Sequence, residues 1–440
     1  MSATNPRETP ASDQLSAPPR RRSGVATGTA VAVAVVLLIG GLGGGYVLAS
    51  YTQTGASRAA TTTTIQLTET GSTLLFPLFK YYWFPNYTAP AGGPNVVLSA
   101  AGTGSGAGQS SSENALVNIG ASDAYLANAS QTNLVNFPVA ISAQLVYYNL
   151  PSPLNHEHLN LNGTELAMIY EGTITTWNDP MILAGQNTTV QNQLNALASE
   201  TIYPTKRTDA SGDTFMFTSL CYVSWSGFTY PASTGGLAGD SIPNMQSGTG
   251  NAGIVSSMQK QVGSIGYIGI SYQSGASQAG LSYAALGDNL SRSASGGTNP
   301  TNYVLPTPST ISADANLGLT HLDYAQTGLA VSLILGGSPA GAIRLLHGGG
   351  GTDPLPGASA PPYPDVNLEY TLIKTAPVSG SKVVTSANLQ ATVQFEEWAL
   401  SKGNYQANGQ ATVWIDNVGF LPLTPEVVGY DIQQLSQVST

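Results

Sequence analysis

The strongest constraint on how this chain folds is an order of segments that occurs three times past residue 60. In each unit a short strand pattern leads into a loop of mostly small residues, and the loop opens directly into a helical run. Every unit therefore sets the first turn of a helix immediately after a strand. The expected strands are 64–68, 95–99 and 201–203, the loops are 70–73, 102–108 and 207–213, and the expected helices are 74–84, 109–117 and 214–223.

These loops are suited to binding anions. The first N–H groups of a helix have no partner within the helix, and the helix dipole adds partial positive charge there. Glycine lets the backbone approach a ligand, and Ser or Thr hydroxyls add donors. None of the three loops contains lysine and no GxxxxGK[ST] motif occurs, so a nucleotide P-loop is excluded. One such loop alone is more often an ordinary capped turn, whereas three in one chain predict an anion site.

Two carboxylates lie where this anion would bind. Asp123 follows the apolar stretch 116–119 at the end of a short strand, and Asp213 lies inside the third loop. An ionised carboxylate only accepts hydrogen bonds, so it faces an anion usefully only when the anion carries a proton. Protonated phosphate has such a proton, whereas sulfate at neutral pH has none. The alternative interpretation is that both aspartates cap helices.

The composition limits the surroundings and the partners of the chain. Apolar residues make up 42% of it, as in ordinary globular proteins, but charged residues make up 9% where roughly a quarter is typical. A surface of uncharged polar groups stays hydrated whether or not carboxylates are ionised, which suits an acidic exterior. Low charge also occurs in heavily glycosylated proteins. The net charge of −10 argues against a nucleic-acid partner, so anion binding must come from local geometry.

The single cysteine and the four histidines predict neither a disulfide nor a metal site. Cys221 follows an apolar helical run and is expected in the core. His156, Glu157 and His158 look like a chelating triplet, but no further ligand stands nearby in the sequence. A solvated loop is therefore the expected structure at these residues.

The N-terminal segment predicts how the chain is held. We expect a cytoplasmic polar tail at 1–24, one transmembrane anchor at 25–49 and a flexible stalk at 50–61. Arginines end the tail and no charge follows until Arg58, which places the rest of the chain outside the cytoplasm. The alternative is a cleaved signal peptide, although its apolar core is typically about 7–15 residues long. Sequons that agree with an exterior location occur at Asn86, Asn128, Asn162, Asn187 and Asn289.

Five segments, in order along the chain, resemble the phosphate-binding receptors of Pst-type ABC transporters. Weaker matches follow at 266–271 and 419–423, so the resemblance extends from about residue 62 to the C-terminus. Separate motifs in a fixed order make the resemblance specific. The five are TGSTLLFPLF at 70–79, GTGSG at 102–106, VNIGASDA at 117–124, GTITTWNDP at 172–180 and SGDTF at 211–215.

The resemblance implies an α/β protein with the type II periplasmic-binding-protein fold. In that fold two lobes with central mixed sheets flank a ligand cleft and are joined by crossover strands. By analogy, lobe one comprises 62–142 and 327–440, and lobe two comprises 143–326. The expected architecture is one N-terminal transmembrane helix followed by these lobes. A ligand that bridges the lobes would hold them shut.

The resemblance also implies which residues bind the ligand. Arg207 would be the only cation on the anion, oriented by Asp209. Thr73 would bind through its hydroxyl and N–H, and Leu74 through its N–H. Position 213 is Asp where many members carry Thr; a second acceptor needs a second ligand proton, which favours the doubly protonated monoanion. The full expected ligand set is Thr73, Leu74, Ser105, Asp123, Arg207, Ser211, Gly212 and Asp213.

The implied function is extracytoplasmic capture of inorganic phosphate and its delivery to the permease subunits of an ABC transporter. Catalysis, cofactors and metals have no part in it, and the chain would be a single-pass protein of the cell membrane. Three alternatives use the same fold: a receptor for another tetrahedral oxyanion, a structural surface protein and a phosphatase. A phosphatase needs a metal cluster or an activated nucleophile, and Ser105 and Ser211 have no His or Lys motif beside them.

Overall fold

The computed structural model describes residues 64–91, 95–127, 129–237, 242–287, 293–296, 300, 302–320, 361–406 and 409–440. They belong to one compact unit, Ala60–Thr440. The predicted tail, anchor and stalk at 1–61 lie outside the described residues. Within the ranges given above, no helix is long and apolar enough to cross a membrane.

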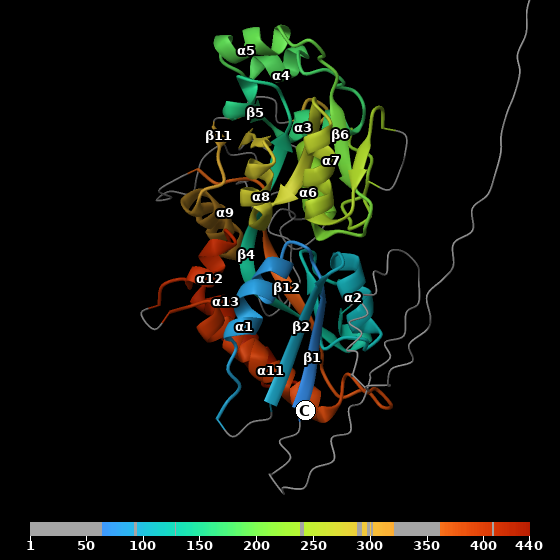
Figure 1. Cartoon of the computed structure of the whole chain (residues 1–440), viewed down its shortest axis with the longest axis vertical. Coiled ribbons are helices and arrows are strands. Elements are labelled where there is room, and N and C mark those ends of the chain that lie inside the picture. Colours follow the sequence, from blue (N-terminus) through green and yellow to red (C-terminus); the bar gives the residue numbers. More distant parts are fainter. Residues whose placement is uncertain are drawn as a thin grey trace, which may run out of the picture. The chain divides into compact units, whose positions relative to one another are not determined.

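Most of the strands join one mixed sheet (Figure 1). Its order is β2-β1-β3-β12-β4-β8-β6-β7, and β9 pairs with β4 beside this path. β1 is parallel to β2 and β3, and β6 is parallel to β7 and β8, whereas β4 and β12 run antiparallel to their neighbours. The strands are β1 Thr64–Gly71, β2 Asn95–Gly102, β3 Ile119–Ser122, β4 Leu134–Tyr148, β6 Tyr203–Arg207, β7 Gln246–Gly248, β8 Ser264–Gly269, β9 Ser282–Tyr283 and β12 Val366–Lys374. A second sheet consists of β5 Asn160–Leu161, β10 Ala285–Gly287 and β11 Tyr303–Val304.

Strand β4 links the two halves of the large sheet. Its residues 134–143 pair with β12, and its residues 144–148 pair with β8. We call β2, β1, β3 and β12 the β1 half, and β8, β6 and β7 the β6 half. Every β4 residue except Val135 is buried, so the strand is covered on both faces. Such a strand does not need to alternate apolar and polar residues. The sequence predicted a central sheet in each lobe; in the structure the two are continuous, since β4 pairs in both.

Helices follow the strands and pack against the sheet (Figure 1). α2 follows β2, α6 follows β6 and α7 follows β7, each within a few residues. On the β1 half, Phe395 of α11 packs against Phe79 and Trp83, with ring centroids 6.0 and 6.3 Å apart. The helices are α1 Phe84–Asn86, α2 Ser105–Glu113, α3 Gly163–Tyr170, α4 Pro180–Ala184, α5 Thr188–Asn195, α6 Gly212–Ser224, α7 Gly250–Lys260, α8 Gln273–Gln278, α9 Pro308–Thr320, α11 Ser386–Trp398, α12 Val413–Asn417 and α13 Pro425–Leu435.

The three predicted strand–loop–helix units are all present, with different ends. β1 and β2 are longer than expected, and β6 begins only at Tyr203. α2 ends at Glu113 rather than Val117, because Ala115 adopts a φ of 54°, which a right-handed helix cannot continue. The first helix begins at Phe76, two residues later than expected, and includes π-helical turns.

Two single-residue interpretations meet different outcomes. Cys221 is buried in α6, as predicted. The Asn162 sequon proves to be a helix cap: its side chain is buried, accepts a hydrogen bond from Glu165 N–H at 3.0 Å and forms a capping box at the start of α3. Asn187 caps α5 in the same way. Sequon asparagines in this chain therefore also serve to start helices.

Candidate functional site

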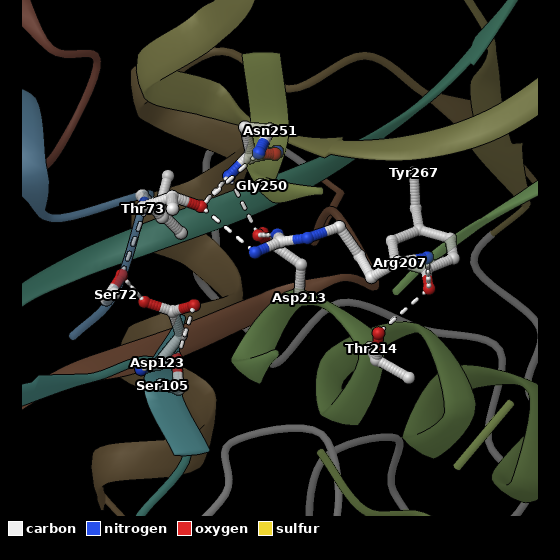
Figure 2. Close-up of polar contacts among 12 residues, drawn as sticks. Ser72, Thr73, Ser105, Asp123, Arg207, Asp213, Thr214, Gly250, Asn251 and Tyr267 are labelled. Atoms are coloured by element: carbon white, nitrogen blue, oxygen red, sulfur yellow. Dashed lines mark hydrogen bonds and ion pairs between the residues drawn. The ribbon is translucent and has the colours of Figure 1, made fainter. Parts of the chain in front are cut away.

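The loops after β1, β2, β6 and β7 meet between the two halves of the sheet. Gly106 N–H donates to the Ala210 carbonyl at 2.9 Å. Arg207 Nη2 donates to the Thr73 hydroxyl at 3.2 Å (Figure 2). Each bond crosses from the β1 half to the β6 half. The N-termini of α2, α6 and α7 therefore lie around one region, at the carboxyl ends of parallel strands.

On the β1 half the central group is the Asp123 carboxylate, directly after β3. Its Oδ1 accepts a hydrogen bond from Ser72 Oγ, and its Oδ2 accepts one from Ser105 Oγ at 3.1 Å (Figure 2). We call these three residues the Asp123 wall. No helix begins within residues 123–127, so the interpretation of Asp123 as a helix cap is wrong.

On the β6 half the central group is Arg207, the last residue of β6. Asp209 binds the guanidinium through both carboxylate oxygens, with Nε 2.9 Å from Oδ1, and Asp213 Oδ2 accepts from Nη1 at 2.5 Å. We call these three residues the Arg207 wall. Burial disfavours the charged guanidinium, but the two carboxylates outweigh it and hold the pKa of Arg207 above its usual value. Asp209 makes the contact with Arg207 that the sequence predicted.

Asp213 lies in the first turn of α6 and is completely buried. Besides Arg207, it has two partners: Asn251 Nδ2 donates to Oδ2 at 2.8 Å, and Gln144 Nε2 approaches Oδ1 at 3.4 Å. Burial and the charge of Asp123 raise the pKa of Asp213 to about 6, although Arg207 opposes the shift. Asp213 therefore gains and loses its proton close to neutral pH.

The sequence did not predict three residues of this network, Ser72, Gln144 and Asn251. Asn251 joins the two halves, because its Nδ2 donates to Thr73 Oγ1 at 3.1 Å as well as to Asp213 (Figure 2). Its Oδ1 accepts the N–H of Gly269 at 3.0 Å, which fixes the orientation of the amide.

A signal for Asn251 was present in the sequence. Thr249, Gly250 and Asn251 open α7 directly after β7, which makes a fourth strand–loop–helix unit. The sequence pattern does not predict this unit, because β7 is only Gln-Ser-Gly and lacks the apolar run that indicates a strand. Ser72 belongs to the first predicted loop, but no pattern distinguished it from its neighbours.

The remaining predicted residues border the same region. Ser211 is buried, and its Oγ has no hydrogen-bond partner among the residues that the structure describes. A Cβ built on Gly212 would lie 2.5 Å from Asp123 Cβ, so only glycine fits there. The N–H of Leu74 donates to Ser72 Oγ at 3.0 Å and is therefore already bonded within the protein. The eight predicted ligand residues thus lie in or beside one network.

This network combines donors with acceptors. One buried guanidinium, several hydroxyls and three helix N-termini can donate to an oxyanion. Two buried carboxylates can accept hydrogen bonds from it. In the part of the chain that the structure describes, no three His, Cys, Asp or Glu side chains are placed to hold a metal ion. This combination of donors and acceptors is suited to binding a protonated oxyanion.

Comparison with known families agrees with the fold. The model of the PBP superfamily domain matches residues 56–315, which is more than half of the chain. The chain therefore belongs to the PBP superfamily. The resemblance drawn from the motifs is confirmed, and the curated relatives specify it further.

Two of these relatives are named phosphate-binding protein PstS. The one from Xylella fastidiosa is 30% identical over 230 residues, which cover 52% of this chain and 59% of that protein. The one from Methanocaldococcus jannaschii is 29% identical over 258 residues, which cover 56% of this chain and 62% of that protein. The chain thus spans about six tenths of the length of these relatives.

Solved structures show the same fold. A phosphate-binding protein from Stenotrophomonas maltophilia aligns with a TM-score of 0.53 and 16% identity, covering 84% of this chain and 93% of that one. An ancestral soluble variant of the human phosphate binding protein aligns with a TM-score of 0.55 and 16% identity, covering 83% and 92%. At this identity the likeness concerns the fold, and it agrees with the predicted α/β architecture.

Proposed function

We propose that the chain captures inorganic phosphate outside the cytoplasm and delivers it to the permease subunits of an ABC transporter. The observation that carries the proposal is one network in which Arg207 stands with two buried carboxylates, Asp123 and Asp213. A cation alone would suit any oxyanion, whereas buried acceptors select an oxyanion that carries hydrogen. The names of the PstS relatives support the same ligand.

Phosphate would replace direct bonds between the two halves. Arg207 and Asn251 both donate to Thr73, at 3.2 and 3.1 Å, and phosphate oxygens would take up these donors. The unpartnered Ser211 hydroxyl and the N-terminus of α6 at Gly212 would add further donors. A ligand held from both sides stabilises the closed arrangement, because it makes all of its contacts only there.

We assign 62–142 and 327–440 to lobe one and 143–326 to lobe two. The change of β4 partner between Ala143 and Gln144 supports this boundary, since β4 leaves the β1 half there. β4 would then be a crossover strand about which the lobes move.

The N-terminal segment is proposed to hold the receptor at the membrane, with a tail at 1–24, an anchor at 25–49 and a stalk at 50–61. The arginines before the uncharged stretch support this topology. We expect the native protein in the membrane fraction, with its N-terminus intact on Edman sequencing. A new N-terminus near Ser50 would show that the segment is a signal peptide.

The same contacts argue against catalysis. The Ser105 hydroxyl donates to Asp123, and the Ser211 hydroxyl has no hydrogen-bond partner among the described residues, so neither serine is paired there with a basic side chain that could activate it. We therefore infer a receptor that releases its ligand unchanged, rather than a phosphatase.

Calorimetry of the full-length protein in detergent, with phosphate and then sulfate, tests the proposal. We expect saturable phosphate binding with one ligand per chain and much weaker sulfate binding. Equal binding of both anions would indicate a general oxyanion receptor. Binding of neither would indicate a structural protein on the same fold.

A further inference from the structure

Strand β12 carries alternate polar side chains behind the Asp123 wall. Asp365, Asn367 and Glu369 are fully buried, although β12 lies inside the sheet between β3 and β4. Asn367 Nδ2 donates to the Asp123 carbonyl at 2.6 Å, which brings this face of β12 to the site. Buried polar groups are costly without partners, so their partners indicate what they do.

Glu369 is a buried carboxyl group without a cation. Its Oε1 accepts a hydrogen bond from Ser142 Oγ, and its Oε2 has no donor. β12 runs antiparallel to β3 in a register that sets Glu369 across from Asp123, the residue directly after β3. The charges of Asp123 and Asp213 both act on the Glu369 carboxyl group. No ion pair involves Glu369 in the described ranges, and Arg207 is bound by Asp209 and Asp213.

Among the described residues, the other titratable groups near Glu369 are acids. Asp365, the residue directly before β12, is also buried, and neither of its oxygens has a hydrogen-bond partner there. Asp314 on α9 is a buried acid that interacts with Asp365. The charges that act on Glu369 are thus negative, and its hydrogen-bond donor is the neutral Ser142.

Two ionised carboxylates that face each other in a buried site repel and cannot hydrogen-bond, because both only accept, so a proton shared between Glu369 and Asp123 is favoured. Asp123 accepts bonds from two hydroxyls, those of Ser72 and Ser105. Glu369 accepts only one, and complete burial, followed by the charge of Asp123, raises the pKa of Glu369 well above its usual range. The proton therefore resides on Glu369.

We propose that Glu369 is a neutral carboxylic acid that donates its O–H to Asp123 and thereby positions Asp123 as the charged acceptor for a hydroxyl of the ligand. The inference rests on the proposed phosphate function and adds a positioning residue to it. A carboxylate offers about four acceptor directions. Ser72, Ser105 and Glu369 take three of them, which leaves one for a P–OH group.

This arrangement links affinity to the proton on Glu369. Where the pH is high enough to remove that proton, phosphate binding must restore it, and the proton comes from the buffer. Each proton taken up on binding weakens affinity about tenfold per pH unit. The ionisation of phosphate itself contributes equally to the pH dependence of affinity in every variant. The contribution of Glu369 therefore appears as a difference in that pH dependence between variants.

Calorimetry on the full-length protein in detergent tests the inference, with phosphate as ligand, from acidic to alkaline pH, in two buffers of different ionisation enthalpy. Glu369→Gln keeps a neutral donor beside Asp123 but cannot ionise. Glu396→Gln is the matched control, because Glu396 is also fully buried with both oxygens unpartnered, and it lies on α11 beside Asp431.

At alkaline pH we expect the wild type and E396Q to take up one more proton than E369Q, with affinity falling about tenfold more per pH unit. Equal proton uptake and equal slopes in all three overturn the inference and leave the proposed function standing. A wild-type protein that does not bind phosphate overturns both. Infrared spectroscopy of the wild type needs no variant: phosphate should shift a carboxylic-acid C=O band, and an unchanged band contradicts the inference.

Discussion

The two walls of the site use charge in opposite ways. The Asp123 wall sets a carboxylate among hydroxyls, and in the described part of the chain no cation contacts it. The Arg207 wall has the guanidinium, but Asp209 and Asp213 bind it closely and neutralise much of its charge. On the proposed function, the Asp123 wall selects a ligand that carries a proton. The Arg207 wall attracts the anion with a positive charge that its own carboxylates partly neutralise.

The largest effect is expected from Asp123→Asn. The variant loses an obligatory acceptor and gains an amide that can donate to an unprotonated oxyanion. A site built to hydrogen-bond a ligand hydroxyl rejects the analogue lacking it by about 10⁴–10⁵, so the phosphate-to-sulfate preference should largely disappear. Competition calorimetry measures it, with the exposed Asp416→Asn of α12 as control. An unchanged preference would mean that Asp123 only holds Ser72 and Ser105 in place.

Removal of the cation breaks the other wall. Arg207→Ala leaves the buried Asp213 and the half-buried Asp209 without their partner, and the loss of one member of a buried ion pair costs about 3–5 kcal/mol. We expect the affinity for phosphate and the affinity for sulfate both to fall by at least about a hundredfold. Lys260→Ala, an exposed cation on α7, is the control. A selective loss of phosphate over sulfate would contradict the division of roles between the walls.

The spacing of the walls depends on Gly212. A Cβ there would lie 2.5 Å from Asp123 Cβ and 2.8 Å from Ser105 Oγ, so Gly212→Ala must push the walls apart. Overpacking of this kind typically costs about 1–3 kcal/mol. We expect a lower free energy of unfolding and weaker phosphate binding, measured by denaturant titration and calorimetry. Gly235→Ala, where a Cβ meets nothing within 4 Å, should change neither.

How much of this could be read from the sequence differs between the walls. The Arg207 wall falls within the segment 207–213, which was predicted as the third loop, so one short stretch of sequence contains Arg207, Asp209 and Asp213. The Asp123 wall was predictable only in part. Asp123 and Ser105 belong to motifs, but the contact of Ser72 with Asp123 joins residues from different loops and depends on how β1 and β3 align.

The polar face of β12 shows where sequence reasoning stops. In the sequence, Asp365, Asn367 and Glu369 alternate with apolar residues, which is typical of a strand with one face in solvent. The structure buries both faces, because β12 lies inside the sheet between β3 and β4 and the helices α2 and α9 pack against it. Only tertiary packing decides that these side chains face the site, and an alternating pattern cannot supply that information.

The smallest effect concerns the second carboxylate. In the structure Asp213 is bound to Arg207, and its pKa is raised to about 6. Below that pH Asp213 is protonated and can donate to a phosphate oxygen; above it the carboxylate needs a P–OH to accept from. The pair formed by Asp213 and phosphate therefore needs one shared proton, wherever that proton resides.

Phosphate affinity should accordingly fall as the pH rises through the second ionisation of phosphate, by about tenfold per pH unit for the shared proton. Asp213→Thr replaces the carboxylate with a hydroxyl that donates at any pH, so the dependence should flatten. Asp213→Asn, which also cannot ionise, should flatten it too if the carboxylate charge is the cause. Calorimetry on both sides of that ionisation decides the matter. If the wild type binds phosphate equally well on both sides, then Asp213 serves only Arg207, and the Arg207 wall does not sense ligand protons.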